Sequence, residues 1–307
     1  MLSFIAISIA ALAVLLLASD WFIDSAEKIG LSFGISPFII GVTIVAFGTS
    51  LPELAASIAS VYSETSEIVI GNVVGSNITN ILLVLGLTAC VGKEIKLNFD
   101  IWNIDMPLLI GSAFLMFFTL QDMYLSFGEA LLYIAALLGF LLNSVLGNTP
   151  DNEERPKITG KDLGKLMIGG VMVYLGAEYT IYGIKGFSEA AGISPEIISI
   201  TFIALGTSLP EVFVSLSAIK RGKHAIAVGN VLGSNIFNTY AVMAIPSFLC
   251  DLKIPEGVIN FGLPFMVAAT ILFGVVTISR KISRFEGVLL LIFYAYFLLE
   301  QFKTLID

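Results

Sequence analysis

Charged side chains are scarce in this sequence of 307 residues. Lysine, arginine, aspartate and glutamate make up 13% of the chain, whereas 57% of its residues are hydrophobic. A soluble domain carries about 25% charged residues. A soluble globule of this length has too little interior to bury so many apolar side chains, so we predict that lipid surrounds the protein.

Cysteine and histidine are scarce as well. Cys90 and Cys250 lie far apart in apolar runs and form no metal-type or redox-type pair, and the one histidine, His224, lies in a basic turn. Zinc sites and histidine-based catalytic triads therefore have almost no ligands or bases to draw on. The net charge of −8 gives no indication of a nucleic-acid partner.

The apolar residues form runs long enough to cross a bilayer. About 20 residues of helix span a hydrocarbon core of about 30 Å, and we predict ten such spans in an all-α polytopic membrane protein. The spans cover residues 2–19, 37–61, 68–91, 104–120, 124–147, 163–184, 195–219, 225–249, 258–279 and 285–302. The first run lacks a basic segment and a cleavage site of small residues, so we interpret it as a span rather than a signal peptide.

The basic residues predict the orientation of these spans. Lysine and arginine accumulate in cytoplasmic loops. The odd-numbered loops hold Lys28, Lys93, Lys96, Arg155, Lys157, Lys161, Lys165, Lys220, Arg221, Lys223, Arg280, Lys281 and Arg284, whereas the even-numbered loops and the C-terminus hold only Lys185, Lys253 and Lys303. We therefore expect a multi-pass protein of the plasma membrane, with both termini extracellular and the polar segment 148–162 in the cytoplasm.

Two blocks of sequence occur twice. GISPFIIGVTIVAFGTSLPE at 34–53 recurs as GISPEIISITFIALGTSLPE at 192–211, and GNVVGSNITN at 71–80 recurs as GNVLGSNIFN at 229–238. Both blocks recur 158 residues later, which indicates a duplication.

The duplication predicts two five-helix repeats, residues 1–147 and 163–307, joined by the linker 148–162. Because five is an odd number of spans, the second repeat enters the membrane from the opposite side. Inverted repeats are typical of transporters, whose substrate site lies near the midplane where the repeats meet.

Each GTSLPE block places a glutamate deep in an apolar run. Glu53 and Glu211 lie about 16 residues into their spans. A carboxylate at this depth is costly unless it is paired, protonated or in contact with water, so both are candidates for function. The preceding prolines, Pro52 and Pro210, should break the helix and free carbonyls of the Gly-Thr-Ser stretch toward a polar cavity.

The second pair of blocks adds neutral oxygen ligands. Residues four apart share one helix face, as Ser76 and Asn80 do in one repeat and Ser234 and Asn238 in the other. Carboxylate, hydroxyl, amide and backbone oxygens together suit hard cations such as Ca²⁺ and Na⁺. Two carboxylates are neutralised by one Ca²⁺ or by two or more monovalent cations, which is an electrostatic basis for exchange.

Other polar residues have plausible structural roles. Asn72, Asn77, Asn230 and Asn235 could instead satisfy the backbone of broken helices, and single serines and threonines often bond to their own helix. Asp20 and Glu178 are also 158 residues apart, at the far ends of the first and sixth spans. We interpret these two as anchors at the membrane interface.

The doubled GTSLPE and GNxxGSN motifs resemble the sodium/calcium exchanger family of the cation/Ca²⁺ antiporter superfamily, in its compact prokaryotic or archaeal form. The resemblance covers essentially the whole chain. It implies ten helices in which the long first and sixth spans pack on an eight-helix core, and alternating access by sliding of that pair. It also implies cation positions between spans two, three, seven and eight.

The resemblance further implies the ligands. Ca²⁺ would be bound by Glu53 and Glu211 with the backbone carbonyls of Thr49 and Thr207. Na⁺ would use oxygens of Ala46, Ser50 and Ser76 and of Ala204, Ser208 and Ser234, and Asn80 and Asn238 would complete the central layer. Many relatives carry aspartate where this chain has Asn238. In the family, an acidic residue at this position accompanies potassium dependence or an extra titratable group.

We therefore expect a secondary antiporter, not an enzyme, that exchanges Na⁺ for Ca²⁺ by alternating access, electrogenically and without K⁺. Its partners would be the inorganic cations and membrane lipid, with no cofactor, no nucleic acid and no obligate protein partner. A proton/calcium exchanger is the alternative, and a cation channel is less favoured. An intramembrane hydrolase using the two glutamates as acid and base would lack a nucleophile and metal ligands.

Overall fold

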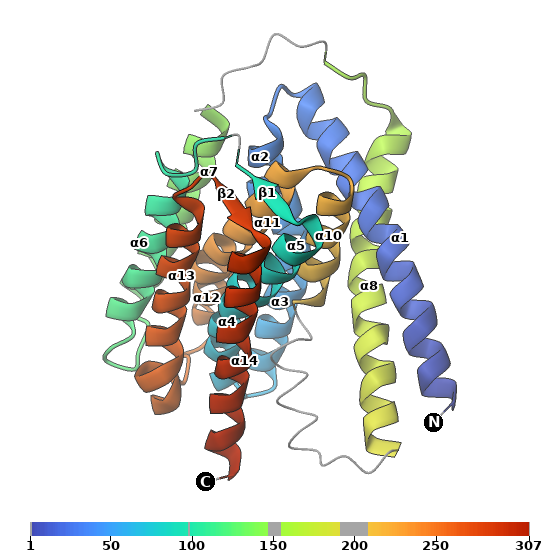
Figure 1. The fold of residues 1–307 in the computed structure, drawn as a ribbon. Helices are drawn as coiled ribbons and strands as arrows, with labels where there is room; N and C mark the ends of the chain where they lie inside the picture. The colour runs from blue at the N-terminus through green and yellow to red at the C-terminus, as the bar shows by residue number, and fades with distance from the viewer. Residues whose placement is uncertain (1, 98, 147–154, 191–207, 307) are drawn as a thin grey trace.

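Helices make up most of the computed structural model, which describes residues 2–97, 99–146, 155–190 and 208–306 (Figure 1). In the first half the elements are α1 (Leu2–Ser32), α2 (Pro37–Ile40), the π-helical segment η1 (Gly41–Val45), α3 (Ala46–Tyr62), α4 (Glu67–Thr79), η2 (Asn80–Val84), α5 (Leu85–Gly92), β1 (Glu94–Lys96), α6 (Asp105–Thr119) and α7 (Phe127–Leu146). In the second half they are α8 (Gly160–Ala190), α10 (Leu209–Lys220), α11 (His224–Phe237), η3 (Asn238–Val242), α12 (Met243–Ser247), η4 (Val258–Gly262), α13 (Leu263–Thr277), β2 (Lys281–Ser283) and α14 (Arg284–Ile306).

Helix is present at every predicted span, although the run 195–219 is described only from residue 208 onward. Among the described residues, six helices are long and apolar enough to cross a membrane: Leu2–Ser32, Pro37–Tyr62, Glu67–Gly92, Phe127–Ser144, Gly160–Phe187 and Val258–Thr277. Asp105–Thr119 is a shorter apolar helix. The helical membrane class is thus confirmed, whereas the ten spans and the repeat boundaries stay predictions.

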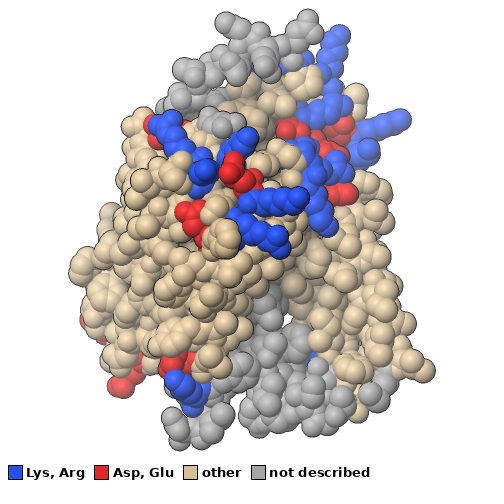
Figure 2. Space-filling view, in the orientation of Figure 1, with Lys and Arg blue, Asp and Glu red and all other residues tan. Residues whose placement is uncertain are grey.

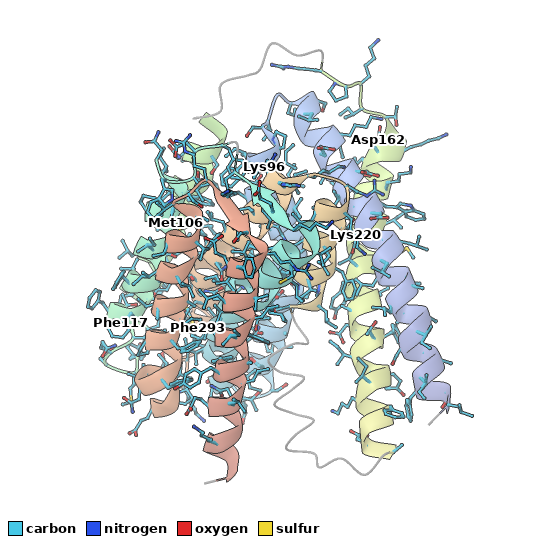
Figure 3. All side chains as sticks on the ribbon, viewed as in Figure 1. Lys96, Met106, Phe117, Asp162, Lys220 and Phe293 are labelled. Atoms are coloured by element: carbon cyan, nitrogen blue, oxygen red, sulfur yellow. The ribbon has the colours of Figure 1, made fainter. Side chains whose placement is uncertain are left out.

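The surface has the charge distribution of a protein surrounded by lipid. On the face drawn in Figure 2, charged residues gather at the upper end, a few lie at the lower end, and the broad belt between them is nearly free of charge. Figure 3 shows Phe117 of α6 and Phe293 of α14 in this belt, below Lys96 and Asp162. Large apolar side chains are exposed there, since Phe118 is 66% exposed. Such a belt matches the hydrocarbon layer of a bilayer.

The duplication is visible in the secondary structure. Helices α1 and α8 have 31 residues each and begin at Leu2 and Gly160, which are 158 positions apart. The π-helical segments η2 and η3 begin at Asn80 and Asn238, again 158 positions apart. In Figure 1, α1 rises from the N-terminus and α8 descends beside it, so these two corresponding helices run in opposite directions.

Helices α1 and α8 stand at one side of the bundle and pack along each other (Figure 1). Gly169, Gly176 and Gly183 form a stripe on α8 at intervals of seven residues. A Cβ atom at Gly176 would lie 3.0 Å from the backbone nitrogen of Leu15, and one at Gly183 would lie 2.7 Å from the carbonyl oxygen of Phe4. Because small residues let helix backbones approach closely, the stripe explains the tight α1–α8 pairing.

A second close crossing joins the two halves at their centre. The segment from α2 through η1 packs on α11, and a Cβ atom at Gly229 would lie 2.6 Å from the carbonyl oxygen of Phe38. One turn later, a Cβ atom at Gly233 would collide with the carbonyl oxygen of Val42. Gly229 and Gly233, the glycines of the second GNxxGSN block, therefore bring the polar faces of α3 and α11 together.

A short antiparallel pair of strands, which the sequence interpretation did not include, links the halves at the upper end. Strands β1 and β2 pair with Glu94 opposite Ser283 and Lys96 opposite Lys281. The pair covers three residues of each strand, so it changes the all-α class only locally.

We predict that Gly233→Ala destabilises the protein. The added methyl group would overlap the Val42 carbonyl, and overpacking of this kind costs about 1–3 kcal/mol. Thermal unfolding of the purified protein in detergent should show a lower Tm for this variant. The matched control is Gly111→Ala in α6, where a Cβ atom meets no described atom within 4 Å and the Tm should not fall. An unchanged Tm for Gly233→Ala would contradict the close crossing.

Candidate functional site

Two carboxylates meet in the interior of the bundle. Glu53 lies on α3 and Glu211 lies in the first turn of α10, and both side chains are 0% exposed. Their carboxyl groups are close enough to interact with each other directly, and Glu211 also lies near the Thr49 and Ser50 hydroxyls. No described residue gives any of the four carboxylate oxygens a hydrogen bond of normal geometry. A buried carboxylate without a partner is costly, so these oxygens require a proton or a cation.

Other polar atoms without partners surround the two acids. Among the described residues, the unpartnered buried atoms outside the acids include both amide atoms of Asn80 and Asn238 and the hydroxyls of Ser50 and Ser208. Every such atom in the described structure belongs to one of the four repeated blocks, except the Ser144 hydroxyl. Native proteins leave only a few buried polar groups unpaired, so this concentration at positions 158 residues apart makes the region a candidate ligand site.

The prediction that the helix breaks at Pro52 is wrong in its location. Helix α3 continues from Ala46 through Pro52 to Tyr62, and the backbone departs from α-helical geometry earlier, in η1. Proline removes one N–H and presses on the carbonyl four residues before it, which here belongs to Gly48. Gly48 has no side chain and tolerates the small shift of its carbonyl. The helix therefore continues through Pro52 and loses only the hydrogen bond that the missing N–H would make. Pro210 lies in the first turn of α10, where an N–H is not needed.

Hydrogen bonds between the halves fix the site. The Thr49 hydroxyl donates to Oδ1 of Asn230 at 3.1 Å and lies 3.3 Å from the Ser234 hydroxyl. The same hydroxyl lies 3.3 Å from the carbonyl oxygen of Ala46. These contacts join α3 of the first half to α11 of the second.

Two asparagines make equivalent bonds within their own halves. Asn72 donates to the Ser57 hydroxyl at 3.1 Å and to the Glu53 carbonyl at 3.2 Å, and Asn230 donates to the Ser215 hydroxyl at 3.0 Å. The structural role considered for Asn72 is therefore seen, because its amide binds a backbone carbonyl and a hydroxyl of the neighbouring helix α3. Sequence reasoning missed Ser57 and Ser215, although each follows a key glutamate by four residues, so the helical spacing was a usable signal.

The structure gathers the predicted site residues that it describes. Ala46, Thr49, Ser50, Glu53, Ser76, Asn80, Ser208, Glu211, Ser234 and Asn238 are all buried, on elements that pack at the centre of the bundle. Ala204 and Thr207 lie outside the described residues.

The ligand chemistry of this centre is oxygen only. Nowhere in the described parts of the chain do three or more His, Cys, Asp or Glu side chains group as a metal centre would need. Two carboxylates combined with hydroxyl and amide oxygens suit Ca²⁺ or Na⁺ and not zinc or copper. The fold and the site together define a helical membrane protein with a buried all-oxygen site where two similar halves meet.

Comparison with known proteins gives the family. The model described as "Sodium/calcium exchanger protein" matches residues 3–146 and 162–303. The sodium/calcium exchanger MaX1 of Methanosarcina acetivorans is 32% identical over 337 aligned positions, which cover 95% of this chain and 96% of that protein. The putative antiporter CaxA of Alkalimonas amylolytica is 33% identical and covers 93% of this chain and 94% of its own length.

The fold agrees with a solved exchanger. A structure of the sodium-calcium exchanger NCX_Mj, soaked with 2.5 mM Na⁺ and 0.1 mM Ca²⁺, is 31% identical and superposes with a TM-score of 0.85. The superposition covers 96% of this chain and 97% of that one. The chain belongs to the sodium/calcium exchanger family, a family of membrane ion exchangers.

Proposed function

We propose that this protein is a secondary antiporter that exchanges Na⁺ for Ca²⁺ by alternating access. The observation that carries the proposal is the pair of buried carboxylates, Glu53 and Glu211, whose oxygens have no partner among the described residues. The exchanger relatives and the fold shared with NCX_Mj support the same substrate class.

Charge balance explains why Ca²⁺ and Na⁺ compete for one site. Glu53 and Glu211 together carry a charge of about −2 when ionised, which one Ca²⁺ neutralises. Two or more Na⁺ ions can neutralise the same charge. The empty site leaves two buried charges close together, so movement without a load is costly and the exchange is coupled.

We assign the ligands as the family resemblance implies. Ca²⁺ binds Glu53 and Glu211 with the carbonyl oxygens of Thr49 and Thr207. The Na⁺ positions use oxygens of Ala46, Ser50, Ser76, Ala204, Ser208 and Ser234, and Asn80 and Asn238 complete the central layer. The burial of Ser50, Ser208, Asn80 and Asn238 without described hydrogen-bond partners supports this assignment.

The proposed topology is two inverted repeats of five spans, in a plasma membrane, with both termini outside and 148–162 in the cytoplasm. The first turn of α1 and the last turn of α14 lie at one end of the bundle, and the start of α8 lies at the other (Figure 1). The α1–α8 pair is the element that slides. Its glycine stripe holds the two helices together as one unit, and this supports the assignment.

The proposed exchanger does not require K⁺. Asn80 and Asn238 bring neutral amides to the centre, and no third carboxylate groups with the two glutamates among the described side chains. The two carboxylates balance one Ca²⁺ or the Na⁺ ions that replace it, and the described site has no further carboxylate to balance an additional K⁺. A proton/calcium exchanger is the alternative, because unpartnered carboxylates also accept protons.

Transport by the reconstituted protein distinguishes the two coupling ions. In proteoliposomes, an outward Na⁺ gradient should drive ⁴⁵Ca²⁺ accumulation, because departing Na⁺ frees the carboxylates for Ca²⁺. A pH gradient of the same size without Na⁺ should drive none, and replacing K⁺ by choline should change nothing. Accumulation that follows the pH gradient and ignores Na⁺ would move the assignment to the proton-coupled alternative.

Single isosteric variants are the matched controls for that measurement. Glu53→Gln and Glu211→Gln each remove one carboxylate charge without changing side-chain shape, and each should reduce ⁴⁵Ca²⁺ accumulation to the level of empty liposomes. The Tm of each variant should stay at or above that of the parent protein, because an unpaired buried charge is gone. Undiminished transport in both variants would refute the site assignment.

Electrogenic exchange gives a further prediction. If more than two Na⁺ leave for each Ca²⁺ that enters, net positive charge moves outward during Ca²⁺ uptake. An inside-positive potential set with K⁺ and valinomycin should therefore accelerate ⁴⁵Ca²⁺ uptake, and an inside-negative potential should slow it. Equal rates at both potentials would show neutral exchange instead.

A further inference from the structure

Glu178 is an ionisable residue in the interior of a long helix. It lies on α8 (Gly160–Ala190), where the helix continues for a further 12 residues to Ala190. The interpretation of Glu178 as an anchor at the membrane interface stays a prediction. A carboxylate at such a position is costly against lipid and normally faces water or a partner.

A cavity lies beside Glu178. Glu178 and Tyr174 of α8 line a space of about 280 Å³, together with Ala55 and Ala59 of α3. The described residues that line it also include Pro52 and Pro210, each of which directly precedes one of the two buried glutamates of the site. Among the described residues of this lining, Glu178 is the one with a charged side chain.

The equivalent position in the first repeat is Asp20, which has a different environment. Its carboxylate accepts a hydrogen bond from the Ser217 hydroxyl and pairs with Arg221 at 3.2 Å. Arg221 also pairs with Asp24 on the same helix at 2.7 Å. Asp20 is thus neutralised where α1 meets the end of α10, although its side chain is still 41% exposed.

Glu178 lacks both of those partners. The counterparts of Ser217 and Arg221, 158 residues earlier, are Ala59, which lines the cavity, and Ser63. All lysines and arginines of the chain lie in the described residues, and none of them forms an ion pair with Glu178. The same acidic position is closed by a salt bridge in one repeat and left open beside a cavity in the other.

We propose that Glu178 recruits cations into this cavity, as the entry carboxylate that precedes Glu53 and Glu211 on the transport path. This inference rests on the proposed cation exchange. A carboxylate in a concave, low-dielectric space raises the local concentration of cations and their rate of association. Glu178 lies nearer to the Ala190 end of α8, so it serves the side of the membrane on which the chain ends lie (Figure 1).

The test is Ca²⁺/Ca²⁺ exchange, which requires Ca²⁺ passage but no Na⁺ coupling. Initial ⁴⁵Ca²⁺ uptake is measured in right-side-out and in inverted membrane vesicles that carry the full chain or Glu178→Gln. At low ionic strength the substitution should raise KM from the side of the chain ends by about three- to tenfold and leave kcat unchanged. KM from the opposite side should not change. The difference should shrink when about 0.5 M choline chloride screens the charge.

Two control variants isolate the charge in the cavity. Glu178→Asp keeps the carboxylate and should keep a KM near that of the parent protein. Glu256→Gln removes an equal charge from an exposed position outside the cavity lining and should leave KM unchanged. A parental KM and salt dependence in Glu178→Gln, or an equal shift in Glu256→Gln, would overturn the inference while the proposed function stands. A parent protein that exchanges no Ca²⁺ would overturn the proposed function, and this inference with it.

Discussion

The constraint on which the structure depends is the burial of two carboxylates side by side without a compensating protein charge. Glu53 and Glu211 are completely enclosed, and no described lysine, arginine or hydrogen-bond donor neutralises them. In the proposed exchange, a bound cation therefore supplies part of the stability of the loaded state. This requirement links the stability of the protein to transport. Without a bound cation the two buried charges are not neutralised, so the change from one access state to the other is costly.

The rest of the fold keeps these carboxylates together and away from lipid. Glycines at the η1–α11 crossing bring the two halves into backbone contact, and the bond from Thr49 to Asn230 fixes them at the height of the acids. The α1–α8 pair contacts this core from one side and contributes no ligand of the assigned set. One part of the molecule can thus hold the ions while another changes which side has access.

Much of this could be predicted from the sequence because the repeat supplied an internal comparison. The 158-residue offset identified Glu53, Glu211 and the polar faces without any structure, and the basic residues predicted which ends of the helices share a side. Local backbone detail could not be predicted. Two features depend on tertiary packing: the π-helical segments at Asn80 and Asn238, and the continuous helix through Pro52. The spacing of apolar residues in the sequence carries no information on that packing.

The surroundings of Asp20 and Glu178 could not be predicted from the sequence either. The equivalence of Asp20 and Glu178 was visible in the sequence. Their different environments were not, since Arg221, which pairs with Asp20, lies 201 residues away in the chain, directly after α10.

The most direct test of the central claim is a calorimetric titration of the purified protein with Ca²⁺ at increasing Na⁺ concentrations. If both ions neutralise the same two carboxylates, the apparent Kd for Ca²⁺ should rise with Na⁺, with a slope of about two or more in a double logarithmic plot. A Kd for Ca²⁺ that does not change with Na⁺ at constant ionic strength would contradict a shared site.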